Sequence, residues 1–184
     1  MSIFGNDPLK GKHIAVLATD GFEQSELEKP VKALKDAGAD VDIVSLKSGS
    51  IKGWDEKDWG DSVKVDKTLD EVQSADYDAL VLPGGQINPD KLRIEPKAVQ
   101  FAADFIGAGK GGGAICHGPW LRVEADALRG KSVTSWSSLK TDIRNAGGHW
   151  QDAEVVVDGN LITSRNPGDL PAFNKTLIEK IGGK

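Results

Sequence analysis

The chain has 184 residues and carries 28 acidic against 23 basic side chains, a net charge of -5. This length suits one domain, so we expect a single domain over residues 1–184 with residues 1–11 as an N-terminal extension. The charge is mild and mixed along the chain, which argues against nucleic acid as the main partner. A lone cysteine forms no internal disulfide, and residues 1–12 lack the apolar core of a signal peptide or membrane anchor. We therefore expect a cytoplasmic protein without a membrane partner.

Strand and helix patterns alternate along the first third of the chain. Residues 13–18 predict a short buried strand, and a helical pattern follows the turn at residues 19–21 and ends at Gly38. Pro30 lies inside that pattern, which predicts a kink there or a later helix start. Residues 40–46 then alternate as a strand. Residues 48–60 are expected to form a polar loop, a small excursion from the sheet that serves as a pocket wall, an interface or neither.

The alternation continues to the end of the chain. Residues 79–82 predict a buried strand that ends at Pro83-Gly84-Gly85, and apolar spacing over residues 99–106 predicts a helix. The remaining expected elements are a strand that ends at Ile115, a strand at 132–135, a helix at 139–146, a hairpin of 154–157 with 161–163, and a helix at 170–181.

Strands that alternate with helices predict a mostly parallel sheet covered on both faces. Ligands in such sheets bind at the carboxyl ends of the strands. The turns after Ala18, Leu82 and Ile115 are therefore expected to face the same rim.

Cys116, the only cysteine, lies where the third of these strands is expected to break into a helix. Small residues two positions before and after it, Ala114 and Gly118, suit a strand-to-helix elbow that projects a side chain into a cleft. A lone cysteine in an apolar run is usually an inert core residue, but a core cysteine does not require Gly118. Pro119 also fits a helix that begins right after the elbow. Cys116 is therefore a candidate nucleophile, and the helix N-terminus is expected to favour its thiolate.

Other candidate residues are predicted at the same rim. Glu26 falls about one turn into the first helix, where its side chain can point back over the strand ends or simply remain solvated. The N–H groups of Gly84 and Gly85 either face a developing oxyanion or form only a tight turn. Trp120 and Trp136 are close enough to the elbow region to line a pocket.

Nucleotide and metal sites are not expected. Gly107, Gly109 and Gly112 match the spacing G-x-G-x-x-G, but a helix precedes and a strand follows them, the reverse of a dinucleotide site. The three histidines lie far apart, without a spaced cysteine or histidine pair that would prearrange a metal site.

Several segments in combination resemble the ThiJ/PfpI family of the class I glutamine amidotransferase-like superfamily. The segments are Asp-Gly-Phe-Glu-Gln-Ser-Glu (20–26), Ala-Leu-Val-Leu-Pro-Gly-Gly (79–85) and Ala-Ile-Cys-His-Gly-Pro (114–119). Residues 153–160, 163–165 and 169–171 are similar to the PfpI branch. The resemblance covers nearly the whole chain and implies a flavodoxin-like three-layer α/β sandwich.

The resemblance also implies roles for individual residues. Cys116 is the expected nucleophile, His117 its neighbour, and Glu26 an acid/base hydrogen-bonded to the sulfur, with N–H groups near Gly85 and His117 facing the oxyanion. In PfpI-type proteases an acidic residue of an adjacent subunit completes a triad with the histidine. Asp90 stands in the matching loop, where a glutamate is expected, and its shorter reach leaves the orientation of His117 open. A homo-oligomer, dimer or hexamer, is expected.

The resemblance implies two kinds of activity, peptide hydrolysis and the handling of reactive dicarbonyls. The intact Cys116 and Glu26 pair, with Asp90 in place of glutamate, favours a stress hydrolase of the glyoxalase or deglycase type that converts methylglyoxal to lactate without a cofactor. Its substrates are small dicarbonyls or modified proteins. The alternatives are an intracellular cysteine peptidase and a redox sensor whose Cys116 thiolate is oxidised to sulfinic acid.

Overall fold

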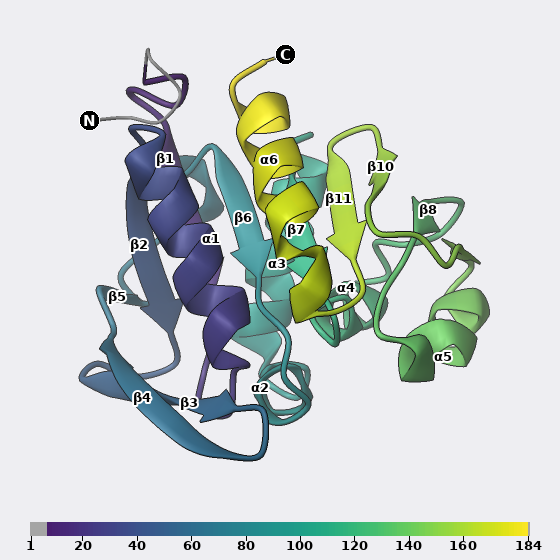
Figure 1. Ribbon diagram of the computed structural model, residues 1–184, viewed down its shortest axis with the longest axis horizontal. Helices are drawn as coiled ribbons and strands as arrows, with labels where there is room; N and C mark the ends of the chain where they lie inside the picture. Colours follow the sequence, from purple (N-terminus) through teal and green to yellow (C-terminus); the bar gives the residue numbers. More distant parts are fainter. Residues whose placement is uncertain (1–6, 184) are drawn as a thin grey trace.

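The computed structural model describes residues 7–183, in which a mostly parallel sheet lies between two layers of helices (Figure 1). The main sheet has seven strands in the order β10-β11-β7-β6-β1-β2-β5. Every neighbouring pair in it is parallel except β10 with β11. The strands are β1 (His13–Leu17), β2 (Asp40–Ser45), β5 (Lys67–Thr68), β6 (Ala79–Leu82), β7 (Gly112–Ile115), β10 (Val156–Asp158) and β11 (Leu161–Ser164).

Two hydrophobic cores fill the space between the sheet and the helices. Helices α1 (Gln24–Asp36) and α6 (Leu170–Ile181) cover one face, and α3 (Pro96–Gly107) and α4 (Trp120–Glu124) cover the other. Successive side chains of a strand point to opposite faces, so Ile14 of β1 packs in the first core and Ala15 in the second. A strand buried on both faces needs a continuous apolar run. The sequence prediction of an α/β sandwich with a mostly parallel sheet is confirmed.

Helix α1 begins at Gln24 and continues through Pro30 to Asp36, so the expectation of a later start is wrong. Proline removes one N–H group from a helix interior, and here the affected acceptor is the carbonyl of Glu26. Burial of one face of the helix, including Leu27 and Leu34, supplies the stabilisation that keeps it continuous.

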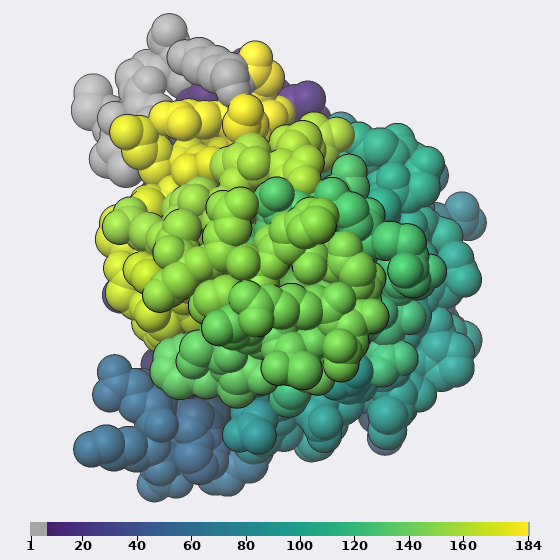
Figure 2. Space-filling model, turned by 90° about the vertical axis from the view of Figure 1, so that its right-hand side faces the viewer, coloured from purple at the N-terminus to yellow at the C-terminus, as the bar shows by residue number. Residues whose placement is uncertain are grey.

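The expected polar loop at residues 48–60 is instead part of a β-hairpin. Its strands β3 (Ser50–Asp55) and β4 (Asp58–Lys64) form a separate two-stranded sheet, which confirms the excursion from the main sheet but not the loop. Only one side of β3 is covered, at Ile51 and Gly53, so the apolar alternation in the sequence is weak. The hairpin projects from the body of the molecule, at the lower left of Figure 2.

Four further segments differ from expectation or extend it. The strand predicted at residues 132–135 is β8 (Ser132–Val133), which pairs with β9 (His149–Trp150) outside the main sheet. Residues 88–91, expected in a loop, belong to helix α2 (Ile87–Leu92), and the helix predicted at 139–146 is α5 (Lys140–Asn145). Leu9, in the expected N-terminal extension, is fully buried. Within residues 7–183, the helices are all too short or too polar to cross a bilayer.

Candidate functional site

Three chain reversals meet at the carboxyl edge of the sheet. Strands β7, β6 and β1 are parallel neighbours, so the turns that follow them open on the same rim, as predicted. The Glu23 N–H donates to the Gly84 carbonyl at 3.2 Å and joins the first two turns. The Cys116 N–H donates to the Ser164 carbonyl at 3.1 Å and joins the third to β11.

Cys116 occupies a strained elbow directly after β7. Its φ of 61° lies in the left-handed region, which non-glycine residues adopt at a cost of about 1 kcal/mol. The chain reverses so tightly that a Cβ at position 118 would lie 2.3 Å from the Leu82 carbonyl oxygen, which explains Gly118. Strain of this kind persists only where surrounding contacts enforce it, and it is concentrated at functional sites.

Glu26 lies beside Cys116 and is completely buried. Its Oε1 accepts the Gly84 N–H at 3.0 Å, while Oε2 accepts no hydrogen bond from residues 7–183. Burial, with a further contribution from the charge of Glu23, raises the pKa of Glu26 from 4.5 to about 8. The carboxyl group is therefore mostly protonated at neutral pH, and the unpartnered Oε2 is the natural position for the proton.

Gly84 explains how these two side chains come together. A Cβ at this position would lie 2.5 Å from Glu26 Oε1 and 2.7 Å from Cys116 Cβ. Only a residue without a side chain fits between them. The next residue, Gly85, has a φ of 78°, and its N–H lowers the pKa of the Cys116 thiol by hydrogen bonding.

The expectation that a helix N-terminus favours the Cys116 thiolate is wrong. Burial, followed by the nearby Glu26 carboxyl, raises the pKa of the Cys116 thiol, and only 8% of Cys116 is exposed. Helix α4 begins at Trp120, four residues after Cys116, so its N-terminus is too distant to dominate. The N–H groups of Gly85 and His117 oppose the effect of burial by hydrogen bonding to the sulfur.

His117 is in direct contact with the sulfur. Its Nδ1 lies 3.2 Å from Cys116 Sγ, and its Nε2 lies 3.5 Å from Ser138 Oγ. Burial lowers the pKa of His117, so the ring is neutral at neutral pH and can accept a proton. Trp120 meets the ring edge-on at 5.1 Å, and Trp136 stacks nearly parallel at 6.2 Å between centroids. Both predicted pocket tryptophans therefore flank His117.

Asp90, by contrast, does not join the other residues. It is exposed on α2, and within residues 7–183 it makes no hydrogen bond to His117. The remaining predicted residues of the site, from Glu26 to Trp136, come together in one protomer.

Asn88 is a buried residue of the site that sequence reasoning missed. Its Oδ1 accepts the Thr19 N–H at 2.8 Å, and its Nδ2 donates to the carbonyls of Pro83 and Gly84 at 3.1 Å each. It thereby ties the turn after β1 to the turn after β6. The only sequence signal was an amide side chain close behind a Pro-Gly-Gly turn, which is common in loops.

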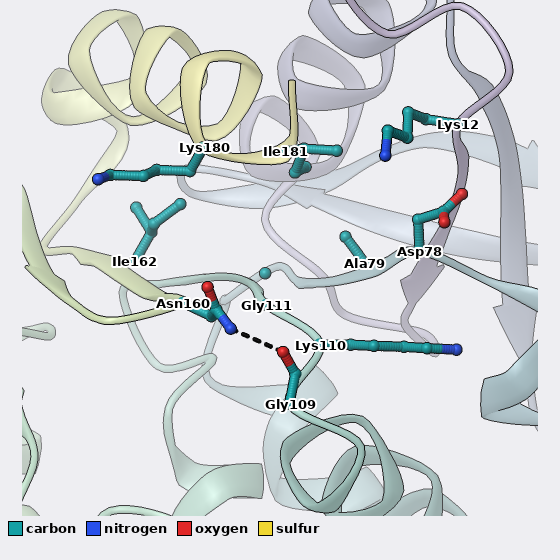
Figure 3. A pocket seen from close by; sticks show the side chains of 11 residues that line it. Lys12, Asp78, Ala79, Gly109, Lys110, Gly111, Asn160, Ile162, Lys180 and Ile181 are labelled. Carbon is teal, nitrogen blue, oxygen red and sulfur yellow. Dashed lines mark hydrogen bonds between the residues drawn. The ribbon is translucent and has the colours of Figure 1, made fainter. Parts of the chain in front are cut away.

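A separate cavity of about 210 Å³ lies at the opposite, amino edge of the sheet (Figure 3). It is lined by Gly112 at the start of β7, whereas Cys116 follows the end of that strand. Lys110 and Lys180 extend away from each other in this view, so their charges do not converge. No three His, Cys, Asp or Glu side chains of the described segment gather where they could hold a metal ion.

Comparisons with known proteins match nearly the whole chain. A family model described as the DJ-1/PfpI family matches residues 12–180. The chain is 45% identical to protein/nucleic acid deglycase 2 of Escherichia coli over 93% of its own length and 98% of the relative. It is also 44% identical to a Bacillus subtilis protein named as a putative cysteine protease, YraA. That match covers 91% of this chain and 96% of the relative.

Among solved structures, a two-domain protein from Anabaena variabilis with DJ-1/ThiJ/PfpI-like and ferritin-like domains superimposes with a TM-score of 0.88. It is 38% identical, and the match covers 93% of this chain and 48% of that longer chain.

Proposed function

This chain belongs to the DJ-1/PfpI family, and from that premise we propose that it is a cysteine-dependent hydrolase of reactive dicarbonyls or their adducts with proteins. The observation that carries the proposal is the buried Glu26 carboxyl held against Cys116 across Gly84. A protonated acid beside a thiol suits reactions that add sulfur to a carbonyl and then move a proton. The relative named as a deglycase supports the same chemistry.

The first step forms a covalent adduct on Cys116. The sulfur attacks the aldehyde carbon of a 2-oxoaldehyde such as methylglyoxal, the protonated Glu26 carboxyl gives its proton to the carbonyl oxygen and is left ionised, and a hemithioacetal results. The N–H groups of Gly85 and His117 stabilise the negative charge that develops on that oxygen. Neutral His117, 3.2 Å from the sulfur, accepts the thiol proton and returns it.

The second step moves a proton along the adduct and releases the product. The ionised Glu26 carboxylate removes the proton from the carbon that carries sulfur and delivers it to the adjacent carbon, which converts the hemithioacetal into a thioester of a 2-hydroxy acid. Water then hydrolyses the thioester, which yields lactate from methylglyoxal and regenerates the thiol. The two steps together consume only methylglyoxal and water, without an oxidant or a cofactor.

The proposal is tested by measuring lactate formed from methylglyoxal without added glutathione. Wild type is expected to form lactate. In Cys116→Ser and Glu26→Gln the rate of lactate formation should fall at least about a hundredfold, the usual scale for a lost acid/base. Glu28→Gln is the matched control, because it removes one carboxylate from the same helix two residues away and should retain activity. Full activity in Glu26→Gln would remove Glu26 from the mechanism.

A cysteine peptidase is the second candidate, favoured by the 3.2 Å contact between Cys116 Sγ and His117 Nδ1. In this alternative the chain works as a homo-oligomer in which Asp90 of a neighbouring protomer orients His117. The redox-sensor alternative has less support, because burial raises the pKa of the thiol and peroxide reacts with the thiolate. A cytoplasmic location is part of the proposal, supported by a single cysteine whose chemistry requires the reduced state.

A further inference from the structure

The turn that carries Glu23 is held by the β3–β4 hairpin. The Gly21 N–H donates to the Lys52 carbonyl at 2.8 Å, and the Trp54 N–H donates to the Phe22 carbonyl at 2.7 Å. The Gln24 Oε1 accepts the Asp61 N–H at 2.7 Å. The hairpin stands apart from the main sheet, near the start of α1 (Figure 1). It thus bonds to two residues of the turn before α1 and to Gln24, the first residue of the helix.

Glu23 itself is fixed at both its backbone and its side chain. Its N–H donates to the Gly84 carbonyl, and a Cβ at Gly85 would lie 2.6 Å from its nitrogen, so the residue is packed against the glycine turn of the site. Its Oε1 accepts the N–H of Glu56 at 3.2 Å. Glu56 stands in the turn of the hairpin with a φ of 56°, a left-handed conformation.

The charge of Glu23 acts on both reacting groups. It raises the pKa of Glu26, second only to burial, and it also raises the pKa of the Cys116 thiol. The other ionisable groups facing this cluster are His117, which is neutral, and Asp55 and Glu56 of the hairpin. Burial and the charges of Asp55 and Glu56 raise the pKa of Glu23 itself, and the hydrogen bond from the Glu56 N–H opposes that rise. Among residues 7–183, no lysine or arginine forms a salt bridge with Glu23 or Glu26.

We propose that Glu23 is a positioning residue of this site: anchored by the hairpin, its negative charge keeps the proton on Glu26 until the sulfur has reacted. Without that charge Glu26 ionises at a lower pH and is a weaker base when it must remove a proton from the adduct. The inference rests on the proposed function in one respect, namely that Glu26 carries out the proton transfer. It also gives the β3–β4 hairpin a function, as the element that holds a second carboxylate at the rim.

The test uses Cys116 as its own reporter, because alkylation of the only cysteine by iodoacetamide follows thiolate formation. Glu23→Gln keeps the shape and an oxygen that can accept the Glu56 N–H, but it removes the charge. We expect the pH midpoint of alkylation to fall by about half a unit or more, the scale of one partly screened charge. The ascending limb of methylglyoxal turnover should move in the same direction.

Two variants separate this role from a structural or general charge effect. Glu23→Asp keeps the charge and should restore the wild-type midpoint, and Glu28→Gln removes a charge elsewhere on α1 and should leave the midpoint unchanged. An unshifted midpoint in Glu23→Gln, or an equal shift in Glu28→Gln, would overturn the inference. Alkylation needs no substrate, so absence of methylglyoxal turnover in wild type would contradict the proposed function alone.

Discussion

Glu26 is the residue at which stability and chemistry conflict most directly. A carboxyl group with no exposed surface loses its hydration on folding, and only one of its oxygens recovers a hydrogen bond from the described chain. Stability alone would favour a neutral side chain at this position. The acid is therefore expected to persist for its chemistry, a conflict typical of strongly shifted groups in active sites.

The conflict predicts a pH-dependent difference between wild type and Glu26→Gln. The folded-state pKa of Glu26 is about 8, above the unfolded value of 4.5, so the folded state holds this proton more tightly. Wild type therefore loses stability as pH rises from 4.5 to 8, whereas glutamine does not titrate. Between pH 5 and pH 8, the free energy of unfolding of wild type should fall by about 3.5 kcal/mol relative to the variant, because the full slope of about 1.4 kcal/mol per unit applies only well between the two pKa values.

Urea unfolding at several pH values measures this difference directly. Groups that titrate equally in both proteins cancel in the comparison. A constant difference across the pH range would mean that the pKa of Glu26 in the folded protein is not raised.

At the residue scale, the sequence predicted where the residues of the site lie better than it predicted their pKa values. Cys116 stood out because glycine and proline surround it, and these two residue types indicate particular backbone conformations. The raised pKa of its thiol did not follow from the sequence, because it depends on how deeply the elbow is buried and on where α4 begins. Asn88 was missed because its three partners lie in two turns that meet only in the folded chain.

At the scale of elements, α2 connects the two turns of the site through Asn88. Replacing Asn88 by alanine leaves the Thr19 N–H and the Pro83 carbonyl without their partner, whereas the Gly84 carbonyl still accepts the Glu23 N–H. We expect a loss of about 2–4 kcal/mol in the free energy of unfolding, because buried polar groups left unpaired are costly. Turnover should fall as well, since the Gly84–Gly85 turn holds Glu26 and carries one of the N–H groups proposed to stabilise the oxyanion.

Gln86→Ala is the control for this prediction. Gln86 precedes the same helix but is exposed, so its loss should change stability by less than about 0.5 kcal/mol. Denaturant unfolding and methylglyoxal turnover of the two variants provide the comparison. Equal stability of both would show that the Asn88 hydrogen bonds are replaced by other groups.

The β3–β4 hairpin is an element whose strands could not be predicted from the sequence pattern. Residues 48–60 have glycine, charge and tryptophan in place of a clean apolar alternation, because the hairpin is covered on one side only and partly by the turn before α1. Its strands are stabilised by pairing with each other and by bonds to residues 20–24. Such contacts between distant segments leave little trace in local sequence.

At the scale of the whole molecule, the parallel sheet itself was predictable, because strands buried on both faces require long apolar runs separated by helical periods. The same topology places the ends of β1, β6 and β7 side by side, so the candidate site follows from the fold. What does not follow is whether that site is complete within one chain. Asp90, exposed on α2, is the residue on which this question depends.

Asp90→Asn separates the two proposed activities at the level of the assembly. Dicarbonyl turnover uses groups of one protomer, so the variant should form lactate from methylglyoxal at the wild-type rate. Peptide hydrolysis needs His117 oriented by a carboxylate of a neighbouring protomer, so cleavage of a fluorogenic peptide should fall at least about tenfold. Light scattering checks that both proteins have the same oligomeric state. If peptide cleavage is unchanged while Cys116→Ala abolishes it, Asp90 is not the third member of a triad, and His117 acts without a carboxylate partner.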